Sequence, residues 1–237
     1  MRLRTEVVPP CALRFARDLA VTIRTKARAG GSDADLFWAD LVGDTAQTVE
    51  ESTTSPPEWL PIARRLPLTF GSGTMRTPIL GVVVHTTNHG AGPETLDRFH
   101  ADWESAKKQS THFMVDREGN IGQFRSTLQR GWHIKTPPPR WDDRYFGIEH
   151  IAKHKQPLTD IQIERSARLI GDLAVLFGFP ARALPRKGDS GIGIHVDFAC
   201  TGCGQGVFWS HDCTSRARTD TYARLVRRAH DFARWGF

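Results

Sequence analysis

A short apolar run that ends in a histidine constrains this chain more than any other feature. Residues 81–84 read Gly-Val-Val-Val, and His85, Thr86 and Thr87 follow directly. A continuous apolar stretch of this length is typical of a strand that is buried on both faces of a sheet. The pattern therefore predicts a buried strand whose end places the imidazole of His85 at the rim of the sheet. Such a histidine is either a hydrogen-bonded structural residue or a metal ligand, and the strand alone does not separate the two.

The composition indicates a globular protein with one sizeable core, since 39% of the 237 residues are hydrophobic. The longest strongly apolar stretch, residues 79–84, is too short to span a bilayer, so we expect no membrane insertion. The arginine-rich start lacks the apolar segment of a signal peptide. We therefore expect cytoplasmic synthesis without export by the general route.

The four cysteines favour thiols or metal ligands over a disulfide framework, because no secretory signal accompanies them. Three of them, Cys200, Cys203 and Cys213, lie close together in the sequence, near His195 and His211. This part of the chain is therefore rich in side chains that bind zinc.

The positive charge belongs to the later part of the chain. Residues 1–75 contain nine basic and nine acidic side chains, whereas residues 76–237 contain 23 basic and 17 acidic ones, which accounts for the net charge of +6. A basic surface suits a polyanionic partner such as a cell-wall polymer, although it also serves simple solubility. No basic stretch has the interleaved aromatic residues of a single-strand binder and no helix-turn-helix spacing is present, so we expect no nucleic-acid partner.

Strand and helix patterns alternate after residue 75. Residues 111–115 and 121–124 predict a hairpin, and residues 145–151 and 191–194 predict further strands. Three helices are expected. The first follows Pro93 and has Leu96, Phe99 and Trp103 on one face, and the second begins at a capping box of Thr159 and Gln162 and ends at Gly178. The third covers about 219–235. The predicted class is α/β of the α+β type, with a central mixed sheet flanked by helices.

Residues 1–75 form a separate, mostly helical appendage of unknown role in this interpretation. Apolar residues recur at helical spacing over 12–28, and residues 52–61 are rich in Ser, Thr and Pro, which is typical of a linker.

Residues 76–237 contain a series of motifs: VVVHTT around His85, THFMVDREGNIGQF at 111–124, Trp132-His133, Gly147-Ile148-Glu149, His195 and a late His-x-Cys. In this order along the chain they resemble the type 2 N-acetylmuramoyl-L-alanine amidases, which share their fold with peptidoglycan recognition proteins. The resemblance does not cover residues 1–75.

The resemblance implies a catalytic zinc ion held by His85, His195 and a third ligand. Strand ends supply a rigid, neutral imidazole pair, and three protein ligands leave one position open for chemistry. The third ligand is either Cys213, just before the last helix, or Cys203, eight residues after His195. We favour Cys213, because Cys203 would leave a long unexplained loop. Cys200 and Cys203 also form a CxxC pair, which suits a redox pair or half of a structural zinc site.

The same resemblance assigns the remaining site residues. Glu149 is expected to be the general acid and base, because Thr111 stands where other members carry a tyrosine. His211 is expected to stabilise the oxyanion, and Trp132 and His133 to contact the substrate.

The implied function is zinc-dependent hydrolysis of the amide between N-acetylmuramic acid and the L-alanine of the stem peptide in peptidoglycan. The alternative is a non-catalytic peptidoglycan-binding module of the same fold. The basic surface favours a lytic, endolysin-like enzyme acting on the bacterial cell wall, over a recycling enzyme or a secreted effector, and a monomer is expected.

Overall fold

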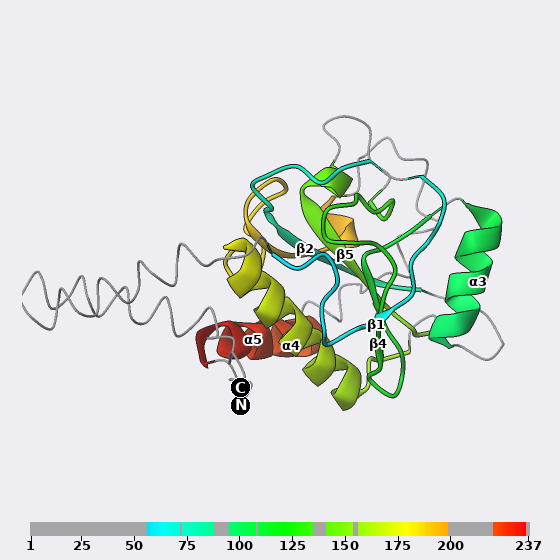
Figure 1. The fold of residues 1–237 in the computed structure, drawn as a ribbon. Coiled ribbons are helices and arrows are strands. Elements are labelled where there is room, and N and C mark those ends of the chain that lie inside the picture. The colour runs from blue at the N-terminus through cyan, green and yellow to red at the C-terminus, as the bar shows by residue number, and fades with distance from the viewer. Residues whose placement is uncertain are drawn as a thin grey trace, which may run out of the picture. The chain divides into compact units, whose positions relative to one another are not determined.

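A six-stranded mixed sheet forms the centre of the protein, seen here in a computed structural model (Figure 1). The structure describes residues 56–71, 73–87, 95–107, 109–134, 141–153, 156–198 and 220–235. The predictions for residues 1–55, and those for Cys200, Cys203, His211 and Cys213, lie outside the described residues.

The strands follow the order β1-β4-β3-β5-β2-β6 across the sheet. Their bounds are β1 Arg64–Arg65, β2 Gly81–Thr86, β3 Phe113–Val115, β4 Ile121–Gln123, β5 Tyr145–His150 and β6 Gly191–Ile194. Strands β3, β5, β2 and β6 are parallel, β4 is antiparallel to β3, and β1 is parallel to β4. The predicted fold class and the predicted hairpin are both confirmed.

Strand β2 is an interior strand that is buried on both faces, as its apolar run predicts. Val82 and Val83 are 0% exposed although they point to opposite faces, and β2 is paired on both sides, with β5 and β6. Because both faces and both edges of β2 are covered, its register is fixed by packing as well as by hydrogen bonds.

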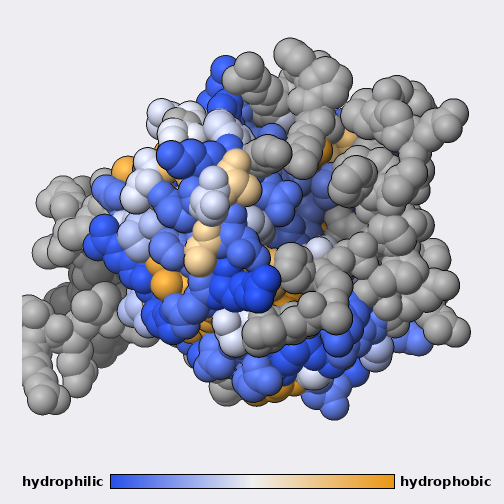
Figure 2. Space-filling model, turned by 90° about the vertical axis from the view of Figure 1, so that its right-hand side faces the viewer, coloured by the Kyte–Doolittle hydropathy of each residue, from blue (hydrophilic) through white to orange (hydrophobic). Residues whose placement is uncertain are grey.

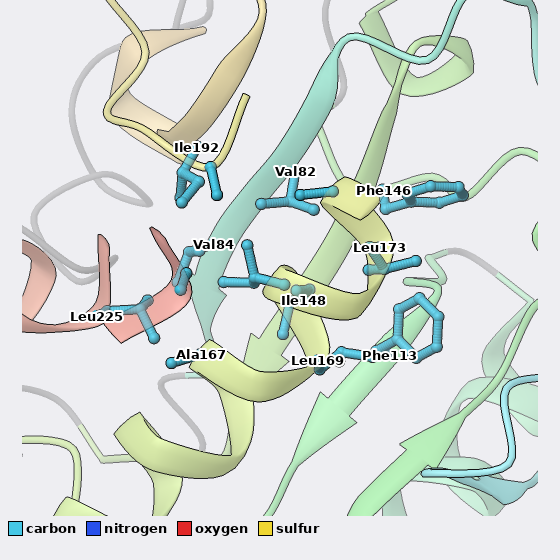
Figure 3. Close-up of a cluster of buried hydrophobic side chains, with 14 of the residues drawn as sticks. Val82, Val84, Phe113, Phe146, Ile148, Ala167, Leu169, Leu173, Ile192 and Leu225 are labelled. Atoms are coloured by element: carbon cyan, nitrogen blue, oxygen red, sulfur yellow. The ribbon is translucent and has the colours of Figure 1, made fainter. Parts of the chain in front are cut away.

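Two helices, α4 (Asp160–Phe177) and α5 (Tyr222–Trp235), cover one face of the sheet. The side chains between sheet and helices form the main hydrophobic core, part of which Figure 3 shows. The sheet contributes Val82, Val84, Phe113, Val115, Phe146, Ile148, Ile192 and Ile194 to it. Each strand therefore directs alternate residues to the helices and leaves the others for the opposite face.

The ends of α4 are set by the residues that the sequence pattern indicated. The hydroxyl of Thr159 accepts a hydrogen bond from the Gln162 backbone N–H, and the Gln162 side chain accepts one from the Thr159 N–H, which completes the capping box. Gly178 ends the helix with φ 73°, a left-handed conformation that glycine adopts without steric cost.

Helix α3 (Leu96–Ala106) belongs to the other side of the sheet. Its buried residues pack with Met114, which alternates with the two β3 residues that face α4. The buried face consists of Leu96, Phe99 and Trp103, as predicted. Figure 1 shows α3 apart from α4 and α5, with the strands between them.

Residues 56–75, which the sequence analysis assigned to the appendage, contribute to the same compact unit as the sheet. They include β1, and the side chain of Leu60 is buried in the main core. The Leu60 backbone N–H also donates to Oε1 of Gln123 at 2.7 Å, which ties this segment to β4.

The described surface is largely hydrophilic on the side that carries α3 (Figure 2). Large exposed hydrophobic residues occur singly, at Leu128, Ile161 and Trp235. None of the described helices is long and apolar enough to cross a membrane.

The contact between β2 and β6 depends on the absence of a side chain at Gly81, where a Cβ atom would lie 1.8 Å from the carbonyl oxygen of Gly191. We predict that Gly81→Ala lowers the free energy of unfolding by about 3 kcal/mol or more, because the clash involves backbone and the two strands must separate. Urea unfolding measures the change. Gly71→Ala is the matched control, since nothing lies within 4 Å of its Cβ position; equal stability of the two variants would contradict the prediction.

Candidate metal centre

The strand register brings three of the predicted site residues into one row across the sheet. His85 of β2 pairs with Glu149 of β5, and Val84 pairs with Ile194, so that His195 follows on the other side of His85. Residues in register on neighbouring strands point to the same face. These side chains point away from α4 and α5, because His85 alternates with Val84 of the main core.

The row lies at the carboxyl ends of β6, β2 and β5, which are parallel. Ligands of open sheets with parallel strands bind outside this edge, since the chain leaves the sheet there in loops. The carboxyl edge is therefore a suitable position for a catalytic centre.

The imidazoles of His85 and His195 meet edge to face. Their Nδ1 atoms are 2.9 Å apart, and the ring planes are inclined by 83°. The residues are only 1% and 8% exposed. Two nitrogen donors thus converge on one buried point although 110 residues separate them in the chain.

His133 lies behind His85. Its Nδ1 is 2.9 Å from Nε2 of His85, on the opposite side of the His85 ring from His195, and its Nε2 is 3.1 Å from the carbonyl oxygen of Tyr145. The His133 side chain is 1% exposed. Substrate contact by Trp132 and His133 stays a prediction, and the contacts described here for His133 are all internal.

Two features of the neighbouring chain position His133. Oδ1 of Asp142 accepts the backbone N–H groups of His133 and Ile134, at 3.0 and 2.7 Å. Gly147 leaves room for the ring, because a Cβ atom there would lie 2.6 Å from Cγ of His133. The glycine of the Gly-Ile-Glu motif is therefore a steric requirement of this site.

Burial controls the charge of this region. Removal from water lowers the pKa of His133 well below its ordinary value, and the neighbouring His85 lowers it further. Burial also raises the pKa of Asp142, against the effect of the two backbone N–H groups that it accepts. The lowered pKa of His133 favours its neutral form.

His112 is a second buried, neutral imidazole next to His133. Its Nε2 is 2.8 Å from the Gln129 carbonyl oxygen, and its Nδ1 accepts the Gly147 backbone N–H at 3.0 Å. One nitrogen donates and the other accepts, which is the pattern of the neutral ring. His112 therefore links β5 to the segment after β4.

Glu149 is partly exposed, in contrast to the buried histidines beside it. Its Oε2 atom is nonetheless buried, and the strand register places the residue next to His85. Thr111, by contrast, is fully buried, and its hydroxyl would lie 2.5 Å from a Cβ atom at Gly147.

Two residues of the site had no signal in the sequence. Nδ1 of His150 is 2.9 Å from the His85 carbonyl oxygen, so that His150 ties the end of β2 to β5. Asp142 anchors His133, as described above. Both residues form hydrogen bonds with backbone groups, and no sequence spacing reveals such bonds. In the sequence, the only signals are that His150 follows Glu149 and that Asp142 follows Trp141.

Trp132 is partly exposed and packs against Phe70, with ring centroids 6.0 Å apart.

Within the described part of the chain, no group of three His, Cys, Asp or Glu side chains is arranged to hold a metal ion. His133 does not join the other two imidazoles at one point because it binds the far side of the His85 ring. The predicted third ligand, Cys213 or Cys203, and the predicted His211 lie outside the described residues.

Residues 75–227 match the model of the family described as N-acetylmuramoyl-L-alanine amidase. The chain belongs to this family. The match covers the whole sheet except β1, together with the predicted site residues. No curated protein is similar enough in sequence to this amidase to count as a match.

Solved structures share the fold of the amidase. The hydrolase AmiA of Staphylococcus aureus, solved in complex with its ligand, is 13% identical, with a TM-score of 0.55 over 80% of this chain and 89% of that one. The catalytic domain of XlyA is 18% identical, with a TM-score of 0.50 over 70% and 97%. A selenomethionine derivative of AmpD is 20% identical, with a TM-score of 0.47 over 74% and 99%.

The buried His112 predicts a specific pH dependence of stability. Burial lowers its pKa from 6.5 to about 3. Between these two pH values the unfolded chain therefore binds a proton at this histidine that the folded protein does not bind. The contribution of His112 to the free energy of unfolding is complete above pH 6.5. It falls by about 1.4 kcal/mol per pH unit as the pH falls toward 3.

Urea unfolding between pH 4 and 7 measures how the free energy of unfolding changes with pH in the wild type and in His112→Phe. The variant should be less stable at pH 7, because it loses both hydrogen bonds of the ring. Its free energy of unfolding should change less steeply with pH, by an amount that corresponds to the binding of up to one proton. Parallel slopes in the two proteins would show that His112 does not carry this dependence.

Proposed function

We propose that this protein is a zinc-dependent amidase that hydrolyses the bond between N-acetylmuramic acid and the L-alanine of the stem peptide in peptidoglycan. The observation that carries the proposal is the convergence of His85 and His195, with Glu149 in the same row, in a chain that belongs to the amidase family.

The donor set fits zinc. The two Nδ1 atoms are 2.9 Å apart, close to the separation of about 3.3 Å between two imidazole ligands of a tetrahedral zinc ion. The chain adds a cysteine after β6, for which we retain Cys213 as the favoured ligand and Cys203 as the alternative. When bound, the ion supplies a Lewis acid that polarises the amide carbonyl and acidifies water.

Glu149 is the proposed proton carrier. A carboxylate beside the two imidazoles takes the proton of the attacking water as the water oxygen bonds to the carbonyl carbon. As the C–N bond then breaks, Glu149 returns that proton to the leaving L-alanine nitrogen. The position of Glu149 next to His85 in the strand register supports this role, because the proton carrier must lie beside the imidazoles.

The other assignments complete the proposed site. His211 stabilises the negative charge that develops on the carbonyl oxygen, and Trp132, which is partly exposed, contacts the substrate. The partner is peptidoglycan and the site of action is the bacterial cell wall.

We propose a lytic, endolysin-like role for a monomer, without nucleic-acid binding or membrane insertion. The positive charge of residues 76–237 supports it, since the wall is anionic. Residues 1–55, the part of the predicted appendage that does not belong to the compact unit of the sheet, are proposed as a separate domain.

Glu149→Gln tests the chemistry. The amide keeps the size of the side chain but cannot accept the proton, so hydrolysis should fall by about 10³-fold or more while zinc content stays unchanged. Mass analysis of the products from purified peptidoglycan measures turnover, and metal analysis of the same sample measures zinc.

Glu118→Gln, which changes an exposed carboxylate in the turn between β3 and β4, is the matched control and should retain full activity. Retained hydrolysis in Glu149→Gln would refute the assignment. A wild type without stoichiometric zinc and without hydrolysis, but with affinity for peptidoglycan, would instead support a binding module of the same fold.

The third ligand is tested by Cys213→Ser and Cys203→Ser. We expect Cys213→Ser to lose zinc in competition with a chelator, and Cys203→Ser to keep it, because only a ligand's thiolate contributes to affinity. Cobalt substitution adds a direct readout, since the thiolate-to-cobalt absorption band should disappear only in Cys213→Ser. The reverse pattern would assign the ligand to Cys203.

A further inference from the structure

We infer that His133 is a positioning residue that fixes the tautomer of His85, so that the Nδ1 lone pair of His85 faces the metal position. The inference rests on the proposed zinc site and adds to it a residue that the ligand set does not include. It follows from the hydrogen-bond chain Tyr145–His133–His85.

The carbonyl oxygen of Tyr145 sets the direction of this chain. A carbonyl only accepts, so Nε2 of His133, at 3.1 Å, must carry the hydrogen. A neutral imidazole has one N–H group, and therefore Nδ1 of His133 is an acceptor. Its partner at 2.9 Å, Nε2 of His85, must then be the donor.

The consequence reaches the opposite side of the His85 ring. With its hydrogen on Nε2, neutral His85 has an unprotonated Nδ1, the atom that lies 2.9 Å from Nδ1 of His195. The other tautomer would present an N–H group at this point and could not coordinate a metal ion without losing that proton. His133 thus selects the tautomer that is ready to bind.

Histidine ligands of metal ions usually donate their second N–H to a carboxylate or a backbone carbonyl. Here an imidazole stands between the ligand and the carbonyl of Tyr145. Because the His133 side chain is 1% exposed, water does not compete for either hydrogen bond.

The surroundings allow His133 little freedom. A Cβ atom at Gly147 would lie 2.6 Å from its ring, so this glycine is needed for the ring to fit, and a Cβ atom at Gly131 would lie 3.1 Å away, which is a tight contact. Asp142 holds the backbone at His133 and Ile134, and the His112 ring packs against the His133 ring with centroids 5.9 Å apart. An apolar side chain would fill this space equally well, but it would not accept the hydrogen of His85.

Two substitutions separate the acceptor from the packing. His133→Phe keeps a ring of similar shape and removes the acceptor. His133→Asn places a carbonyl oxygen at a distance along the side chain similar to that of Nδ1, and so retains an acceptor for His85. His100→Gln is the control, because His100 bonds to the Pro67 carbonyl oxygen outside the site.

The first readout is the tautomer itself. Nitrogen NMR of the metal-free protein, with the His85 signals assigned from their loss in His85→Gln, should show hydrogen on Nε2 in the wild type, in His133→Asn and in His100→Gln. His133→Phe should show a mixture of the two tautomers. Hydrogen on Nδ1 of His85 in the wild type would overturn the inference, whether or not the Phe variant folds.

The second readout is zinc affinity, measured by competition with a chelator. We expect His133→Phe to bind zinc about 10- to 100-fold more weakly. His133→Asn should recover most of the affinity, and His100→Gln should match the wild type. A folded His133→Phe with wild-type affinity and an unchanged His85 tautomer would also overturn it. If the wild type binds no stoichiometric zinc, the proposed function fails, while the tautomer measurement still decides the role of His133.

Discussion

The parallel register of β6, β2 and β5 is the constraint on which the site depends. A shift of one residue would turn His85 toward α4 and expose two buried valines to the opposite face. Val82 and Val84 are at most 2% exposed in the main core, so the hydrophobic packing against α4 and α5 opposes such a shift. The burial of aliphatic side chains on one face therefore sets the position of the imidazoles on the other.

The second feature of the site is a buried hydrogen-bond network of histidines behind His85. His112 donates to one backbone carbonyl and accepts one backbone N–H, and His133 bridges Tyr145 and His85. Such networks are costly when a partner is missing and rigid when all are present. The rigid network lies behind His85, whereas Glu149, the proposed proton carrier, is a partly exposed residue.

Much of the fold was predictable because its local signals agree with the tertiary structure. The capping box at Thr159 and the glycine at 178 bound α4 as expected, and the spacing of Leu96, Phe99 and Trp103 gave the buried face of α3. The last helix also formed as predicted, over Tyr222–Trp235. Residues 56–75 were harder to interpret, because a two-residue strand such as β1 has no periodicity to detect.

The sequence by itself determined the buried central strand, the helices that cover it and the identity of the side chains at the strand ends, because apolar periodicity and capping act over a few neighbouring residues. Only the tertiary structure decided that His195 meets His85, that Gly147 makes room for the ring of His133, and that this ring faces His85. These contacts join residues far apart in the chain. Their geometry depends on the strand register and on the space left by missing Cβ atoms, and neither the register nor this space can be read from a local sequence pattern.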